Sequence, residues 1–404
     1  MGLRLAIIGG GPGGLYGAIA AARQGIEVVL FEKGEIGDHI VCGECIFDSL
    51  GLLEKPEAGL LYKVETILFE AQGVHRLAIR DYRNLWMMDR RAWQRHLATK
   101  AANLGVAIRT GEKINHHNLS EIKTNYDWVL DASGAPSVTS RVYGFSQEYQ
   151  RECLLAYQYV LKGDFSRLQQ TIKVGFISHI KLEYLPGYYW IFPRDEQTAN
   201  VGVVYAGGVD RKFTLDIKGL LHEVMEKESL GEATVLRKGG GLIPACILSC
   251  LVHENIILVG DAAGLTSPLH GGGIDLACIS GVLAVEAIRK GKQGVAAYRD
   301  NLLALMKDKI ALETLIIKKM RRLSFADFDD LLQAAAVKKP WIRTKTGLRH
   351  PDLLIAAWRW LRKRPCDFLG VHQFHLTSFF KKWICPFTIR TSPSTVKERS
   401  WNRP

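Results

Sequence analysis

The chain has 404 residues, of which 47% are hydrophobic and 23% charged, so it can bury a substantial core and wholesale disorder is excluded. Eight cysteines are too few for a disulfide scaffold in a chain of this length. No apolar run approaches the roughly 20 residues of a membrane-spanning helix. The first strand is expected too close to Met1 to leave room for a secretory signal, so we expect a cytoplasmic protein.

The net charge of +12 is concentrated at the C-terminal end of the chain. Residues 318–404 hold 19 Lys and Arg against 6 Asp and Glu, whereas the rest of the chain is close to neutral. The basic residues alternate with large apolar ones, as in Trp358–Arg364 and Phe379–Ile384. This pattern favours attachment to an anionic membrane surface, although a solvated basic face or a nucleic-acid contact gives a similar pattern. We expect a peripheral protein on the inner face of a membrane, with no nucleic-acid partner.

The first 32 residues carry the clearest pattern. Buried strands are expected at Leu5–Ile8 and Ile26–Phe31, with an Ala-rich helix over Leu15–Gln24 between them. The first strand runs into a G-x-G-x-x-G motif made by Gly9, Gly11 and Gly14. Such glycines allow a sharp turn, a close approach of a pyrophosphate and close packing of helix on strand. Glu32 follows the second strand, where an acid accepts hydrogen bonds from a ribose, so the stretch predicts a dinucleotide site.

Strands and helices are also expected between residues 42 and 134. A Cys42-Gly43-Glu44-Cys45 loop is followed by one or two strands within Val64–Ile79. A helix is expected over Arg91–Leu104, directly after Met88-Asp89-Arg90, and then a strand at Val106–Ile108. The strand at Tyr126–Asp131 ends in a turn of small residues, Asp131–Gly134, which lets backbone pass close to a cofactor.

The middle of the chain alternates like an antiparallel sheet. The expected strands are Leu154–Leu161, Thr171–Ile177, Tyr188–Phe192 and Asn200–Tyr205. A buried strand at Asn255–Val259 then leads into Gly260-Asp261, and a long helix is expected over Asp275–Lys290 after a run of glycines. Helices are expected beyond Gly294. The sequence lacks a second G-x-G-x-x-G motif, so it gives no sign of a separate NAD(P)H domain.

The pattern predicts an α/β protein: a Rossmann-like dinucleotide-binding domain, an inserted antiparallel sheet for the substrate and a helical C-terminal region. We place the dinucleotide-binding domain, which the resemblance described next makes an FAD-binding domain, at 1–145 and 235–300, with part of it in 62–110. The substrate domain is placed at 146–234, and the basic helical region at 301–404.

Four separated motifs resemble the FAD-binding set of the para-hydroxybenzoate-hydroxylase-like flavoproteins. By this resemblance the FAD-binding residues are Gly9, Gly11, Gly14, Glu32, Arg90, Asp131, Asp261, Gly272, Gly273 and Ile274. The resemblance places Asp261 at the flavin ribitol and the backbone of Gly272–Ile274, at the helix N-terminus, at the flavin pyrimidine edge. A helix N-terminus stabilises the negative charge of a reduced flavin.

Two further motifs resemble geranylgeranyl reductases of the archaeal type. One is Tyr188-Tyr189-Trp190-Ile191-Phe192-Pro193 followed by Asn200-Val201-Gly202, and the other is the Cys42-Gly43 loop. The resemblance covers residues 3 to about 325, and Cys45 departs from it. It implies that FAD delivers a hydride to a C=C bond of a polyprenyl lipid and that a proton is added at the other carbon. The electron donor is left open among a ferredoxin, a quinol and NAD(P)H.

The expected catalytic residues are Cys42, Glu44, Tyr188 and Trp190. Tyr188 and Trp190 would hold the apolar chain and attract positive charge, although sheet residues of this kind also pack in ordinary cores. Cys42 or Glu44 would relay the proton. Cys42 with Cys45 also fits a redox disulfide or half a zinc site, but zinc needs a second pair and no metal is expected.

Two other functions stay open on the same scaffold. One is a flavin monooxygenase or halogenase, although halogenases carry W-x-W-x-I-P where this chain has Tyr188-x-Trp190-x-Phe192-Pro193. The other is a flavoprotein or lipid-binding protein that keeps FAD for structural reasons.

Overall fold

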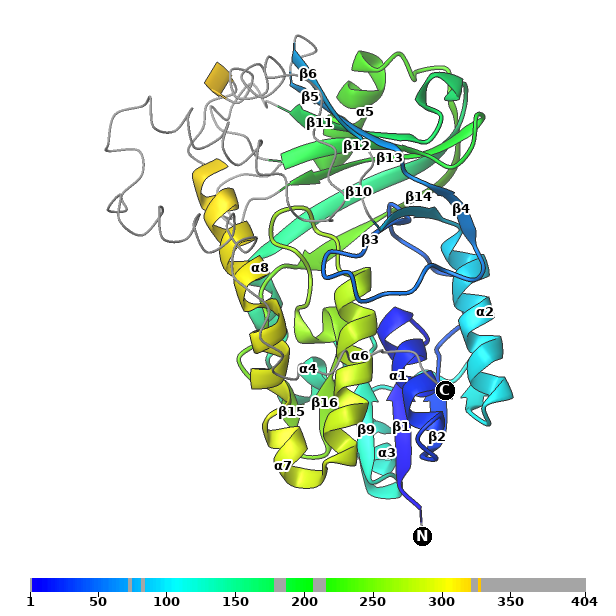
Figure 1. Ribbon diagram of the computed structural model, residues 1–404, viewed down its shortest axis with the longest axis vertical. Coiled ribbons are helices and arrows are strands. Elements are labelled where there is room, and N and C mark those ends of the chain that lie inside the picture. Colours follow the sequence, from blue (N-terminus) through cyan, green and yellow to red (C-terminus); the bar gives the residue numbers. More distant parts are fainter. Residues whose placement is uncertain are drawn as a thin grey trace, which may run out of the picture.

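The computed structural model describes residues 2–71, 75–80, 84–177, 187–205, 216–320 and 326–327. Its lower half in Figure 1 is built on a six-stranded sheet with the order β15-β16-β9-β1-β2-β8. The strands are β1 (Arg4–Ile8), β2 (Glu27–Phe31), β8 (Ala107–Arg109), β9 (Trp128–Asp131), β15 (Val252–His253) and β16 (Ile256–Leu258). The pairs β8–β2–β1–β9–β16 are parallel, which is the Rossmann-like arrangement that the sequence predicted.

Helices cover this sheet. They are α1 (Pro12–Ala22), α2 (Arg90–Asn103), α3 (Leu119–Asn125), α4 (Val138–Tyr143), α6 (Ile274–Arg289) and α7 (Gly291–Ala296). The helix α1 lies beside α6, and both bury apolar faces in the largest core cluster. The glycines at their crossing allow this contact, because a Cβ on Gly281 would lie 2.2 Å from the Gly13 carbonyl oxygen.

The upper half of Figure 1 is a seven-stranded sheet with the order β14-β10-β13-β12-β11-β5-β6. Its strands are β5 (Thr66–Ala71), β6 (His75–Arg80), β10 (Cys153–Lys162), β11 (Thr171–Ile177), β12 (Gly187–Pro193), β13 (Thr198–Tyr205) and β14 (Thr234–Pro244). Neighbours are antiparallel except β11 and β5, which are parallel. The helix α5 (Ile217–Lys227) packs its apolar side on one face of β10 and β13.

A small three-stranded sheet lies between the two halves. It has the order β3-β7-β4, formed by β3 (Cys45–Phe47), β4 (Leu60–Lys63) and β7 (Leu85–Met88). Short 3-10 helices are η1 (Ser146–Gln150), η2 (Ser166–Leu168) and η3 (Gly260–Ala263). The helix α8 (Tyr298–Met320) rises from α7 along one side of the molecule towards the seven-stranded sheet.

The predicted fold class is confirmed, and the four central strands of the antiparallel sheet begin or end within two residues of the expected bounds. The sheet pairing differs from the predicted domain boundaries in two places. The strands β5 and β6 fall within 1–145, which was placed in the FAD-binding domain, but they belong to the seven-stranded sheet. Residues 235–244 were also placed in the FAD-binding domain, but they belong to β14, which pairs along the whole of β10. The strand was missed because most of its side chains are exposed and three consecutive glycines interrupt its pattern.

The basic segments Trp358–Arg364 and Phe379–Ile384, together with Cys366 and Cys385, lie outside the described residues. Among the residues that the structure does describe, no helix has the length and hydropathy needed to cross a membrane.

Candidate functional site

A cavity of about 1250 Å³ runs between the six-stranded and the seven-stranded sheets. At one end it is lined by the glycine-rich loop and Glu32, and further along by Arg90, Asp261 and the start of α6. The rest of its wall comes from the seven-stranded sheet, the Cys42 loop, the three-stranded sheet and α8. Segments that are far apart in the sequence therefore meet around one cavity, which is large enough for a dinucleotide and part of a second molecule.

The glycine-rich loop forms an open cradle. Gly9 has a φ of +105°, and a Cβ there would lie 2.5 Å from the Ala132 carbonyl oxygen. A Cβ on Gly14 would lie 2.0 Å from the Gly9 carbonyl oxygen, whereas Gly11 has open space on that side. The Glu32 carboxylate accepts hydrogen bonds from the backbone N–H of Gly10 at 2.7 Å and of Gly34 at 3.2 Å. The acid thus holds the loop in shape while it lines the cavity.

Asp131 is fully buried and lies behind the cavity wall. Its carboxylate accepts hydrogen bonds from the backbone N–H and the hydroxyl of Ser133 and of Thr139, at 2.5 to 3.0 Å. These bonds shape the turn 132–135, whose residues do line the cavity. Asp131 therefore does not face the cavity. It positions the backbone that does.

Arg90 and Asp261 line the middle of the cavity. Arg90 donates to Gln94 at 2.5 Å, and Gln94 donates to the Gly10 carbonyl at 3.1 Å, but the buried Arg90 Nε has no hydrogen-bond partner within the described structure. Burial raises the pKa of Asp261, although its carboxyl is open to the cavity, and the nearby Arg90 guanidinium opposes that rise. Unpaired polar groups of this kind fit a polar ligand in the cavity.

The start of α6 also faces the cavity, through Gly272, Gly273 and Ile274. Gly273 is the N-cap and has no side-chain cap hydrogen bond. The Gly272 N–H, in contrast, donates to His270 Nδ1 at 3.1 Å and is therefore already used. The positive end of the helix still favours negative charge at this place.

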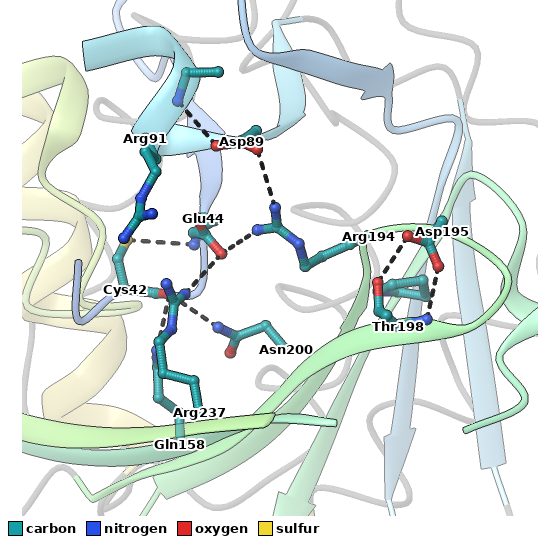
Figure 2. A network of polar contacts seen from close by, with 12 residues as sticks. Cys42, Glu44, Asp89, Arg91, Gln158, Arg194, Asp195, Thr198, Asn200 and Arg237 are labelled. Atoms are coloured by element: carbon teal, nitrogen blue, oxygen red, sulfur yellow. Dashed lines mark hydrogen bonds and ion pairs between the residues drawn. The ribbon is translucent and has the colours of Figure 1, made fainter. Parts of the chain in front are cut away.

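Three aromatic residues of the Tyr188–Pro193 motif, Tyr188, Trp190 and Phe192, line the cavity from β12. The Tyr188 hydroxyl donates to the His270 carbonyl at 2.6 Å. Trp190 Nε1 donates to Asn200 Oδ1 at 2.8 Å, and Asn200 Nδ2 donates to the Cys42 carbonyl at 2.9 Å. The second part of the motif thus holds both the indole and the Cys42 loop, as Figure 2 shows for the loop.

Glu44 lies in a charge network behind this loop, shown in Figure 2. Its side chain is 2% exposed and its backbone has a φ of +61°. The carboxylate pairs with Arg194 and lies 3.3 Å from Arg237, while Arg194 also lies 3.5 Å from Asp89, the N-cap of α2. Glu44 is not among the residues that line the cavity, so its geometry favours an anchoring role over the proton relay that the sequence predicted.

Cys42 and Cys45 both line the cavity as free thiols. Cys42 Sγ accepts a hydrogen bond from the Glu44 N–H at 3.3 Å, and its carbonyl accepts one from Gln158 at 3.0 Å. Burial raises the pKa of Cys45 far above its usual range, so this thiol stays protonated. Among the described residues, no group of three His, Cys, Asp or Glu side chains is arranged to hold a metal ion.

Several polar residues at the cavity or at the Cys42 loop were not predicted from the sequence: Gln158, Asn200, Lys309 and Glu313. His270, which also lines the cavity, was assigned no role. Asn200 belongs to the quoted motif, so its amide was available as a signal. Lys309 and Glu313 are spaced four residues apart on α8, a pattern that usually marks an exposed helix pair.

Replacing Glu44 by Gln is expected to lower the free energy of unfolding by about 3 kcal/mol, because it leaves Arg194 without its buried partner. Denaturant unfolding measures this change. Glu57→Gln is the control, because Glu57 pairs with Lys100 at 2.8 Å on the surface and such pairs contribute less than about 1 kcal/mol. Equal losses in the two variants would contradict an anchoring role for Glu44.

Comparison with known proteins adds to this geometry. The pyridine nucleotide-disulphide oxidoreductase family profile matches residues 3–164. The chain is 31% identical over 308 residues to the digeranylgeranylglycerophospholipid reductase of Methanocaldococcus jannaschii, with 70% of this chain and 76% of that protein covered. It is 27% identical over 325 residues to the protein of the same name from Thermoplasma volcanium, with 70% and 77% covered.

Solved structures share the fold. A geranylgeranyl bacteriochlorophyll reductase-like protein from Thermoplasma acidophilum superimposes with a TM-score of 0.74 at 20% identity, covering 90% of this chain and 98% of that one. A flavin-dependent brominase superimposes with a TM-score of 0.64 at 19% identity, covering 90% and 100%. The sequence relatives decide between these two likenesses. The chain belongs to the digeranylgeranylglycerophospholipid reductase family, as its motifs predicted.

Proposed function

We propose that this chain is an FAD-dependent reductase that saturates C=C bonds of a geranylgeranyl or other polyprenyl chain carried by a lipid or a prenyl diphosphate. The observation that carries the proposal is that one cavity combines a glycine-rich part with an apolar part. A glycine-rich cradle leads into an apolar pouch on the seven-stranded sheet and its neighbours, lined by Ile67, Phe69, Leu85, Ile172, Val174 and Phe176. A pouch of this kind suits a hydrocarbon chain.

The cavity residues fit FAD. The cradle of Gly9, Gly11 and Gly14 is open where a pyrophosphate would approach, Arg90 Nε lacks a partner, and Asp261 is accessible from the cavity. In this role Glu32 holds the ribose, Asp261 the ribitol, and the start of α6 the end of the ring. Asp131 acts through the turn that it shapes. When bound, FAD supplies the two electrons of the reaction as a hydride.

The protein's own residues position the substrate. Tyr188 and Trp190 line the same cavity as the cradle and the pouch, and their rings favour positive charge that develops on an alkene carbon. The Asn200 bridge holds the indole of Trp190 in place and fixes the Cys42 loop at the same wall. The Cys42 thiol then lies where it can gate the chain or relay a proton.

The electron donor is proposed to be a separate ferredoxin, quinol or NAD(P)H, because the sequence has no second dinucleotide motif. The basic segment 318–404 is proposed to hold the enzyme on an anionic membrane, where prenyl lipids lie. We expect the full chain to sediment with anionic vesicles, to sediment less with neutral ones, and to be released by salt. Equal, salt-insensitive binding to both would contradict the membrane role.

Glu32→Gln is expected to weaken FAD binding about 10- to 100-fold, because a charged acceptor of two backbone N–H groups is lost. Titration of the apoprotein, followed by flavin fluorescence, gives the dissociation constant. Glu27→Gln, at the start of the strand β2 that precedes Glu32, is the control, since Glu27 pairs with Arg4 at the surface, 3.5 Å away. An unchanged affinity in the Glu32 variant would remove this residue from its proposed role.

The function is tested by an anaerobic single turnover of chemically reduced protein with a geranylgeranyl lipid. We expect oxidation of the flavin, seen by absorbance, and a gain of two mass units for each reduced bond. Reduced protein that is inert to the alkene but reacts rapidly with oxygen would instead support a monooxygenase or halogenase.

Val174→Trp is expected to lower the rate of this turnover at least about tenfold while FAD is retained, because the indole occupies the apolar pouch. Val235→Trp, on the exposed part of β14, is the matched control and is expected to react like the wild type. Normal turnover in the Val174 variant would show that the prenyl chain lies elsewhere.

A further inference from the structure

A small polar cluster interrupts the apolar wall of the cavity where α8 passes it. Lys309 and Glu313 come from α8, and His270 comes from the segment just before α6; all three line the cavity. Lys309 Nζ lies 2.8 Å from Glu313 Oε1, and His270 Nε2 lies 3.8 Å from the same oxygen. The apolar residues around them include Leu269, Ile316 and Ile317.

The hydrogen bonds define the state of the His270 ring. Its Nδ1 accepts from the Gly272 N–H at 3.1 Å, so in the neutral ring the proton must be on Nε2. That Nε2 is buried and has no hydrogen-bond partner among the described residues. Burial lowers the pKa of His270 and the Lys309 ammonium adds to this, while Glu313 and Asp275 oppose it, so the ring is neutral at pH 7.

Glu313 shows the complementary feature. The residue is 8% exposed, and its second oxygen, Oε2, is buried without a partner in the described part of the chain. An unpaired oxygen at the edge of a large cavity is rare in native proteins, where such atoms usually serve a ligand or a reaction. Here one carboxylate oxygen is held by Lys309, and the other is free to carry a proton.

The cluster adjoins the proposed substrate wall. The Tyr188 hydroxyl donates to the His270 carbonyl at 2.6 Å, and the imidazole lies against the Phe47 ring with 5.7 Å between the centroids. Tyr188, Phe47 and Glu313 all line the same cavity. A prenyl chain that lies along Tyr188 therefore passes close to the only carboxyl group that α8 contributes to the described cavity wall.

We propose that Glu313 is the proton donor of the double-bond reduction, with Lys309 and His270 as its positioning residues. This rests on the proposed function. In the step, the Glu313 O–H bond breaks and its proton forms a C–H bond at one alkene carbon with the π electron pair. The hydride forms the C–H bond at the other carbon, so the alkene gains two electrons and two hydrogens.

The surroundings suit the carboxylate that remains. The Lys309 ammonium stabilises its negative charge, and His270 Nε2–H is placed to donate to it after a small approach. Water that reaches the cavity then returns the proton. The arrangement explains why a neutral, correctly oriented imidazole is kept at this place.

The test uses Glu313→Gln in the FAD-loaded protein. We expect at least a 100-fold slower single turnover with the geranylgeranyl lipid. We also expect the wild-type rate to fall as pH rises, and this fall to be lost in the variant. Lys309→Met should move that fall to higher pH, because the positive charge that favours the carboxylate is gone. Lys307→Met, on an exposed position of the same helix, is the matched control and should leave the profile unchanged.

A second measurement does not depend on turnover. Infrared spectra of the holoprotein, recorded over a range of pH, should contain a carboxyl band that appears on protonation, shifts in heavy water and is absent from Glu313→Gln. If the variant loses FAD, Lys309→Met alone still tests the proposal through its pH profile. A profile unchanged in both variants would overturn the proposal and return the proton step to Cys42.

Failure of the proposed function gives a different result. In that case the wild type would not reduce the lipid at all, while its infrared band would still respond to Glu313→Gln. If the wild type reduces the lipid and the band is unaffected by the substitution, the proton-donor role alone is overturned.

Discussion

The close approach of α1 and α6 is the constraint on which the rest of the site depends. Both helices begin at the cavity, one at the glycine-rich loop and the other at Gly273, so their spacing sets the distance between two parts of the wall to which we assign FAD. Backbone lies where side chains would normally separate helices, since a Cβ on Gly281 would meet the Gly13 carbonyl at 2.2 Å. A larger residue would push the two helix ends apart and misplace everything that they hold.

A second set of contacts joins the half built on the six-stranded sheet to the seven-stranded sheet. The Cys42 loop is fixed to the seven-stranded sheet through Asn200 and Gln158, and Glu44 ties it to Arg194 and Arg237. Because Arg194 also reaches Asp89, the start of α2 belongs to the same network. The residues that resemble a family motif thus act as a connected frame, in which aromatic wall, thiol loop and cofactor cradle keep one relative position.

The sequence predicts well what is encoded locally. Period-two alternation, buried apolar runs and glycines at fixed offsets predicted the central strands, α1, α2 and α6 within a few residues. The partners of Glu44 lie 150 and 193 residues away, and no local pattern indicates such a pairing. The cluster on α8 was missed for the same reason. In the sequence Lys309 and Glu313 form an ordinary i, i+4 helix pair, and only the fold brings His270 close to Glu313.

The parallel pair of β5 with β11 has a consequence for how the chain assembles. The strand β5 comes from residues 66–71, far ahead of the other strands of the sheet except β6, yet it pairs with β11 from Thr171 to Phe176. Without it β11 would present an open edge beside the apolar pouch. The seven-stranded sheet is therefore not formed by one continuous segment. It is complete only when β5, from much earlier in the chain, pairs with β11, and pairings between such distant segments are slow to form. Moving the seven-stranded sheet between relatives requires transferring both segments together.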